Sequence, residues 1–196
     1  MDSIIIAASS ETMGTAMDSS RRWYALRVKP QHERTVSYTL QKKGFERYVP
    51  IYKAFRRWSD SLKELDLPIF PGYVFCRLGP LDTAEVLATP AVYQLVGRGA
   101  APAPIEDHEL HDIQRIESAG LPVVPWPCLK EGQRVRIARG PLSGLTGLLA
   151  GSNNAWHVVV NVQLLQRGVA VAVDRGDIAP LATAATAASG GGIVQK

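Results

Sequence analysis

Cysteine and histidine are scarce in this sequence. Of its 196 residues only two are cysteines, Cys76 and Cys128, and only four are histidines. Their spacing matches no metal-ligand pattern, so no metal site is predicted. Two thiols this far apart in the chain are expected to stay free in a reducing compartment.

Long apolar runs are also lacking. No stretch approaches the roughly 20 residues that a membrane-spanning helix needs. The run Ile4-Ile5-Ile6-Ala7-Ala8 is short and has no basic leader, which is not the pattern of a secretory signal. We therefore expect a cytoplasmic protein.

Motifs for chemistry are missing as well. The sequence has no Gly-rich phosphate loop, no nucleophile elbow and no His-Glu metal helix. Asp107, His108 and His111 share one predicted helix, where a helix start and a solvent-facing side explain them. Cys76 on a predicted strand is interpreted as a small buried hydrophobe. We expect no enzyme and no cofactor. An enzyme whose site the motifs do not reveal is kept as an alternative hypothesis.

Acidic residues are few in the first third of the chain. Net charge is +4, yet between Arg21 and Glu64 twelve basic residues accompany only four acidic ones. Such an excess indicates a polyanionic neighbour. A solvated basic surface remains the alternative.

The pattern of apolar and turn residues over 21–120 predicts an α+β sandwich, an antiparallel sheet with flanking helices. Apolar alternation and helical spacing, separated by turn residues, define the elements. Strands are expected at 23–28, 45–52, 69–78 and 92–96, helices at 31–43, 83–89 and 105–118, a protruding hairpin or loop at 53–67, and a loop at 97–104. Asp82 and Glu85 suggest a capping box.

After residue 120 the spacing of the apolar residues changes. Residues 121–127 are Pro-rich and are expected to form an extended linker between domains. Residues 128–183 alternate with a period of two and carry frequent turn residues, which predicts a small all-β barrel. Residues 1–20 and 184–196 are expected to be disordered ends.

The segment Phe70-Pro71-Gly72-Tyr73-Val74-Phe75-Cys76 carries the main functional hypothesis. In a strand, Tyr73 and Phe75 point to one face, and Val74 and Cys76 to the other. The rings belong to the core if they are buried, and to an interface if they are exposed. We assign Trp23 to the core and expect Tyr73 and Phe75 to be an uncovered docking surface.

The predicted helix at 31–43 presents cations away from its Val36 and Leu40 stripe. Arg34, Lys42 and Lys43, with Lys29 just before the helix, are candidates for phosphate contacts. A solvated helix surface explains them equally well.

Four stretches in order resemble the NusG family over residues 21–182. They are Arg22-Trp23-Tyr24-Ala25-Leu26, Phe70 to Val74, Pro102-Ala103-Pro104-Ile105, and Glu131 to Ile137 followed by Gly140-Pro141-Leu142-Ser143-Gly144. The resemblance implies a NusG N-terminal domain at 21–120 and an SH3-like KOW barrel at 128–183. It also implies a transcription elongation and antitermination factor.

In this family the N-terminal domain docks on the clamp helices of the largest RNA polymerase subunit and suppresses pausing. By position the resemblance implies a polymerase-binding pocket of Tyr24, Phe70, Pro71, Tyr73 and Phe75. It places Lys29 and Lys42 towards upstream or non-template DNA, and residues 82–89 towards the opposite lobe of the cleft.

The KOW barrel of family members recruits Rho or a small-subunit ribosomal protein. The predicted partner-binding residues here are Leu142, Leu164, Leu165 and Arg167. The loop that usually carries an Ile-Phe-Gly-Arg-like run reads Leu164-Leu165-Gln166-Arg167-Gly168, which resembles specialised paralogs of the UpxY and RfaH type. We expect a monomer. The alternative is an RNA- or ribosome-binding KOW protein without polymerase contact.

Overall fold

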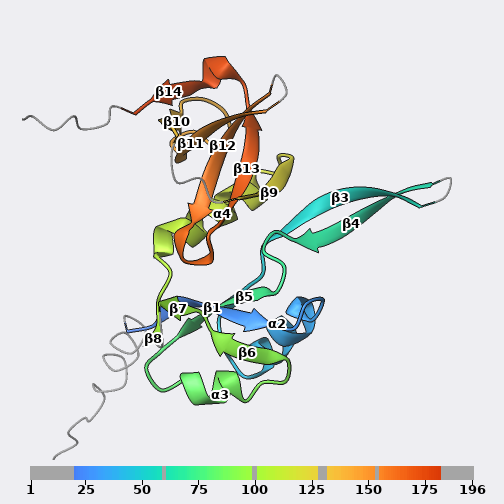
Figure 1. The fold of residues 1–196 in the computed structure, drawn as a ribbon, viewed down its shortest axis with the longest axis vertical. Coiled ribbons are helices and arrows are strands. Elements are labelled where there is room, and N and C mark those ends of the chain that lie inside the picture. The colour runs from blue at the N-terminus through green and yellow to red at the C-terminus, as the bar shows by residue number, and fades with distance from the viewer. Residues whose placement is uncertain (1–19, 59–60, 99–100, 128–131, 153–154, 182–196) are drawn as a thin grey trace, which may run out of the picture.

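The described residues form two larger antiparallel sheets, with one helix between them, and two separate two-stranded sheets (Figure 1). The computed structural model describes residues 20–58, 61–98, 101–127, 132–152 and 155–181. The ends that were expected to be disordered lie outside these ranges, apart from Ser20. None of the described helices is long and apolar enough to cross a membrane.

The first sheet has the strand order β2-β5-β1-β6. Its strands are β1 (Arg22–Val28), β2 (Arg47–Tyr48), β5 (Tyr73–Leu78) and β6 (Val92–Leu95). Strand β1 is central and pairs antiparallel with both β5 and β6. The predicted antiparallel sheet is thereby confirmed. The strand expected at 45–52 is shorter, because β2 has only two residues and a separate strand begins at Ile51.

The two faces of this sheet are covered by different helices. Helices α2 (Glu33–Lys42) and α3 (Thr83–Leu87) cover one face, where Leu26 and Val74 pack with Val36 and Leu40 of α2. Trp23 and Phe75 belong to the cluster of the other face. Alternation along β1 and β5 produces this division, since neighbouring residues of a strand point to opposite sides.

A long hairpin projects from the body of the protein (Figure 1). Strands β3 (Ile51–Trp58) and β4 (Ser61–Pro68) pair antiparallel along their whole length. The Lys53 ammonium and the Glu64 carboxylate form an ion pair across it. Of the two forms considered for residues 53–67, the structure has the hairpin.

Helix α4 (Asp107–Ser118) lies between the two sheets. Its buried stripe is Leu110, Ile113 and Ile116, the stripe on which the helix was predicted. These side chains belong to one continuous buried cluster that extends from the first sheet into the second. The helix is therefore the packing element common to both halves of the chain.

The second sheet has six antiparallel strands in the order β14-β10-β11-β12-β13-β9. They are β9 (Val123–Pro127), β10 (Arg134–Ile137), β11 (Thr146–Ser152), β12 (Ala155–Val162), β13 (Arg167–Val173) and β14 (Ile178–Pro180). Two short 3-10 turns, η1 (Gln163–Leu165) and η2 (Arg175–Asp177), follow β12 and β13. The predicted all-β character is confirmed.

Three local predictions are wrong in detail. Residues 123–127 are no free linker, because β9 pairs with β13 from Val123 opposite Val171 to Pro127 opposite Arg167. The expected loop at 97–104 contains a small hairpin of β7 (Gly97–Arg98) and β8 (Ala101–Pro102). The Asp82 carboxylate makes no helix cap and instead accepts a bond from the Gly79 amide at 2.8 Å.

The buried thiol of Cys76 makes stability depend on alkaline pH. Burial raises the pKa of Cys76 to about 12, whereas an unfolded thiol has a pKa of about 8.5. The unfolded chain therefore loses a proton first, and we expect the free energy of unfolding to fall as pH rises from about 9 towards 12.

Denaturant unfolding of wild type and Cys76→Ala at pH 7, 9 and 10 checks this prediction. The variant is less stable overall but should show the shallower decline between pH 7 and 10. Equal declines in the two proteins would show that this thiol does not contribute. Tyr48, whose pKa is also raised by burial, adds to the loss only above about pH 10.

Candidate binding surfaces

A tight turn presents the aromatic segment. The Tyr73 amide donates to the Phe70 carbonyl at 3.2 Å, with Pro71 and Gly72 between them. Gly72 has a φ of +83°, which a type II turn requires and which favours glycine. The buried carboxylate of Glu33, from α2, accepts the Gly72 amide at 2.7 Å. Helix α2 and the turn are therefore held together.

The exposure expected for the ring at Phe75 is wrong. Phe75 is 0% exposed and Phe70 is 1% exposed. The two rings pack edge to face with centroids 5.5 Å apart. Both lie within the cluster that includes α4, so the apolar stripe of that helix takes up the surface that the rings would have offered. Tyr73, in contrast, keeps an intermediate exposure.

The residues of the predicted polymerase pocket do not share one face. Tyr24 packs against the α2 cluster, whereas Tyr73 and Phe75 belong to the α4 cluster. Arg27, which sequence reasoning missed, is exposed and pairs with Tyr73 across β1 and β5. The signal for Arg27 was available, because it follows Trp23 and Ala25 at every second residue.

The second sheet docks against the Tyr73 face. The guanidinium carbon of Arg167 lies 5.6 Å from the centroid of the Tyr73 ring. Nη2 of Arg115 in α4 donates to the Ser143 carbonyl at 2.9 Å. The Gln163 amide donates to Oε1 of Glu109, also in α4, at 3.3 Å. These polar contacts surround the buried cluster shared by α4 and β12.

The predicted partner-binding residues of the second half lie at this contact or under it. Arg167 is exposed and faces Tyr73, while Leu164 is partly buried against the shared cluster. Leu142 and Leu165 are 2% and 7% exposed. The two surfaces predicted to bind different partners therefore contact one another through Arg167 and Tyr73.

A carboxylate at the end of α4 fixes the helix to the first sheet. Oε2 of Glu117 accepts the Tyr48 hydroxyl at 2.6 Å, and Oε1 accepts the Ile51 amide at 3.2 Å. Burial, then the adjoining Glu117 carboxylate, raises the pKa of Tyr48 well above its usual value. No pattern in the sequence pairs these two residues, which are far apart in the chain.

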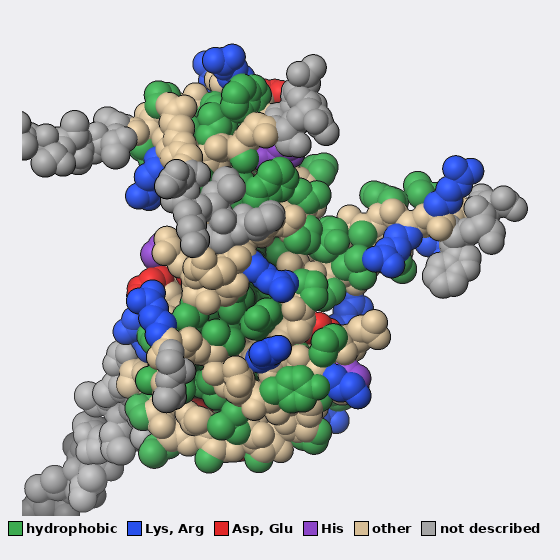
Figure 2. Space-filling model, viewed as in Figure 1, with side chains coloured by type: hydrophobic (Ala, Val, Ile, Leu, Met, Phe, Trp, Pro, Cys, Tyr) green, Lys and Arg blue, Asp and Glu red, His purple; other side chains and the backbone are tan. Residues whose placement is uncertain are grey.

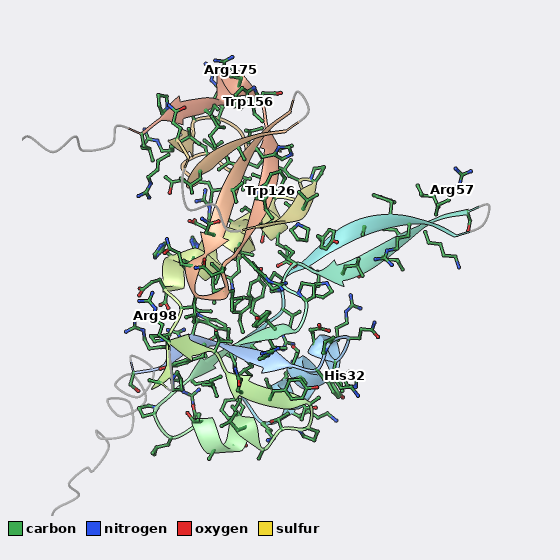
Figure 3. All side chains as sticks on the ribbon, in the orientation of Figure 1. His32, Arg57, Arg98, Trp126, Trp156 and Arg175 are labelled. Carbon is green, nitrogen blue, oxygen red and sulfur yellow. The ribbon has the colours of Figure 1, made fainter. Side chains whose placement is uncertain are left out.

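An open, mainly apolar groove of about 460 Å³ lies at the base of the hairpin. Its lining includes Tyr52 and Phe55 of β3, Leu121 and Pro122 of the connection between α4 and β9, and Val123, the first residue of β9. Figure 3 shows Trp126 of β9 beyond the hairpin base and Arg57 near the outer end of the hairpin. In Figure 2 hydrophobic side chains line the inner part of the hairpin and basic ones its outer part.

The four cations predicted to bind nucleic acid have different surroundings. Nζ of Lys43 donates to the Glu85 carbonyl at 2.9 Å and to the Thr89 hydroxyl at 3.0 Å, so it joins α2 to α3. Arg34 pairs with Asp66 of the hairpin at 3.3 Å. Lys42 lies over the ring of Tyr38, and Lys29 is exposed at the end of β1.

Comparison with known proteins gives one consistent result. The family model described as "Transcription termination factor nusG" matches residues 21–114. A curated relative from Thermus thermophilus, described as "Transcription termination/antitermination protein NusG", is 27% identical over 176 residues, covering 79% of this chain and 96% of the relative. The protein of the same description from Borreliella burgdorferi is 24% identical with the same coverage.

A solved structure shows the same fold. It is described as "Domain interaction in Thermotoga maritima NusG" and aligns with a TM-score of 0.51 at 21% sequence identity. The alignment covers 82% of this chain and 97% of that one. The likeness therefore includes both sheets, since the first sheet and its helices alone make up a smaller share of the chain.

Proposed function

Because this chain belongs to the NusG family of transcription termination and antitermination factors, we propose that it binds RNA polymerase and suppresses pausing during elongation. The observation that carries the proposal is the face around Tyr73. An aromatic ring of intermediate exposure is presented there by a rigid turn, opposite an exposed arginine. Aromatic and arginine side chains of this kind are the usual anchors of protein interfaces.

The polymerase contact is centred on Tyr73, Arg27 and the exposed Pro71, and the buried Phe70 and Phe75 serve as its support. A buried ring cannot touch a partner, yet the edge-to-face pair of Phe70 and Phe75 fixes the strand that carries Tyr73. The groove at the hairpin base offers further apolar surface. A helical segment with an apolar stripe and an acidic flank would suit such a surface, and we assign this role to the clamp helices of the polymerase.

The docked arrangement of the two sheets is a closed state in this proposal. Arg167 occupies the Tyr73 ring that the polymerase would use, so polymerase and the second sheet compete for it. Opening requires the α4 contacts at Ser143 and Gln163 to break. Binding of polymerase then shifts the population towards the open form, at a cost equal to the docking free energy.

Pausing is opposed without a chemical step. Helix α3 and its surroundings, including Leu81 at 91% exposure and Leu87 at 41%, offer apolar surface away from the Tyr73 face. We assign this surface to the opposite lobe of the polymerase cleft. A protein that contacts both lobes favours the closed clamp by differential binding and disfavours the opened, paused form.

The second sheet is assigned to the KOW class of SH3-like barrels, and its released surface would recruit Rho or a small-subunit ribosomal protein. Its turn reads Leu164-Leu165-Gln166-Arg167, with Gln166 left-handed at a φ of 52°. This sequence favours a specialised paralog of the UpxY or RfaH type. The alternative, an RNA- or ribosome-binding KOW protein, gives no role to the Tyr73 face.

Capture of RNA polymerase by the immobilised full chain tests the proposal. Tyr73→Ala removes a central anchor, and we expect binding to weaken about 30-fold, the effect of a typical interface hot spot. Arg167→Ala removes the guanidinium that lies over the Tyr73 ring in the closed state. The ring is then more accessible, and polymerase binding should rise by about 2- to 5-fold.

The matched control is Tyr38→Ala, which truncates an exposed tyrosine on α2 and should bind polymerase free of nucleic acid like wild type. Circular dichroism establishes that each variant is folded. If folded Tyr73→Ala binds polymerase as tightly as wild type, the contact has been placed on the wrong face. If wild type itself captures no polymerase, the proposed function fails.

A further inference from the structure

The outer half of the β3–β4 hairpin projects away from both larger sheets. Strands β3 and β4 form a separate two-stranded sheet of the described fold and pair only with each other (Figure 1). Every side chain is exposed at residues 55–57 of β3 and 61–64 of β4, which we call the hairpin arm. A two-stranded hairpin is only marginally stable by itself, because it has neither a third strand nor a covering helix. The arm is therefore placed to gain stability from a partner.

Two large hydrophobic side chains lie on one face of the hairpin arm. Phe55 is 64% exposed and Leu62 is 69% exposed. Leu62 lies opposite Arg57, which is two residues from Phe55, so strand alternation places all three side chains on the same face. Phe55 also lines the groove at the hairpin base. The apolar surface of the groove therefore continues onto the hairpin arm.

The hairpin arm is also basic. Arg56 lies directly opposite Lys63, and like charges in this position destabilise a strand pair. The described acidic residues of the hairpin form their ion pairs nearer its base, Glu64 with Lys53 and Asp66 with Arg34. Basic side chains accordingly mark the outer part of the hairpin in Figure 2. A partner that brings carboxylates to the arm would offset the repulsion between its cations.

We propose that the hairpin arm binds an acidic protein surface. Phe55 and Leu62 fill an apolar hollow of that surface, and Arg56 and Arg57 pair with the carboxylates around it. Aromatic and arginine side chains are the residues that most often dominate the energetics of protein interfaces. Nucleic acid would satisfy the cations, but its phosphates offer no apolar contact to two exposed hydrophobic side chains.

Continuity of the apolar surface indicates which protein this is. The groove at the hairpin base belongs to the surface that we assign to RNA polymerase, so the arm and the groove hold the same partner. In this respect the inference rests on the proposed function. Strand β3 has eight residues and extends about 26 Å, which takes the arm well beyond the Tyr73 face. The arm is thus a second anchor, separate from Tyr73.

Capture of core polymerase, free of nucleic acid, by the immobilised full chain tests the inference. Leu62→Ala and Arg57→Ala leave the lining of the groove unchanged, and each should weaken binding by about 5- to 10-fold. Phe55→Ala should lose more, about 30-fold, because its ring contributes to both the arm and the groove. The matched control is Arg139→Ala, which removes an exposed arginine of the second half and should bind like wild type.

Two further measurements separate the roles of the arm residues. Binding of wild type should weaken as salt is raised, since exposed ion pairs are screened. Arg56→Ala should reduce this salt dependence, whereas Leu62→Ala should retain it. Amide hydrogen exchange at residues 55–57 and 61–64 should be fast in the free chain and slower when polymerase is bound. Circular dichroism establishes that each variant is folded.

The inference is overturned if the folded arm variants bind polymerase like wild type, or if exchange in the arm is equally fast in the free and bound chain. A loss that appears only when polymerase carries a nucleic-acid scaffold also overturns it, because the arm then binds nucleic acid. If Tyr73→Ala weakens capture and the arm variants do not, the proposed function stands and only the role of the arm fails. If wild type captures no polymerase, both fail.

Discussion

Replacing Phe75 by alanine is expected to lower the free energy of unfolding by about 3–5 kcal/mol. The ring is fully buried between Phe70, at a centroid distance of 5.5 Å, and Tyr48, at 6.2 Å. Its removal loses the transfer free energy of the ring and leaves a cavity that close-packed neighbours fill only in part. Urea unfolding followed by circular dichroism measures the effect.

Tyr73→Ala is the matched control for this prediction. It removes a ring from the same strand two residues away, but that ring only packs against the buried cluster and keeps an intermediate exposure. We expect a cost of less than about 2 kcal/mol. Similar losses for the two variants would contradict the different roles assigned to them, in which Phe75 supports the fold and Tyr73 contacts the partner. A variant lacking both rings would not separate binding from folding.

Replacing Glu117 by alanine is the second large effect, expected at about 2–4 kcal/mol. Hydrogen bonds to a charged group contribute about 1.5–3 kcal/mol each, and this carboxylate accepts two. Its loss leaves the Tyr48 hydroxyl and the Ile51 amide without their acceptor. Because Glu117 lies in the last turn of the helix that packs between the two sheets, its removal also loosens the attachment of α4 to the first sheet.

A double-mutant cycle with Tyr48→Phe isolates this contact. Urea unfolding of wild type, Glu117→Ala, Tyr48→Phe and the double variant gives the coupling free energy of the pair. We expect a coupling of about 1 kcal/mol or more. Glu117→Gln keeps the size and one acceptor oxygen, and should lose less than Glu117→Ala. A coupling near zero would show that Glu117 stabilises the protein in some other way.

Some features of the candidate site could be predicted from the sequence and others could not. The turn at Phe70-Pro71-Gly72-Tyr73 could be read from residue types, since proline and glycine at its centre favour a type II turn. The face of each ring could also be read, because strand alternation is local. Whether a face stays open could not, because the cover of Phe75 comes from α4, some 30 residues further along the chain.

The amino-acid sequence by itself determined the family motifs, the basic first domain, and most helices and strands. Alternation predicted the central strands, and the stripe of Leu110, Ile113 and Ile116 predicted α4. These features depend on neighbours in the chain, whose spacing fixes the backbone period and the buried side of each element.

Only the tertiary structure decided what each buried or exposed side faces. In the folded protein residues 123–127 pair with β13 as a strand of the second sheet. Tyr48 donates a hydrogen bond to Glu117, and Arg167 lies over the ring of Tyr73. It also left Tyr38 uncovered on α2. The physical reason is that hydrogen bonding across strands and packing across faces link residues by distance in space, which local periodicity does not encode.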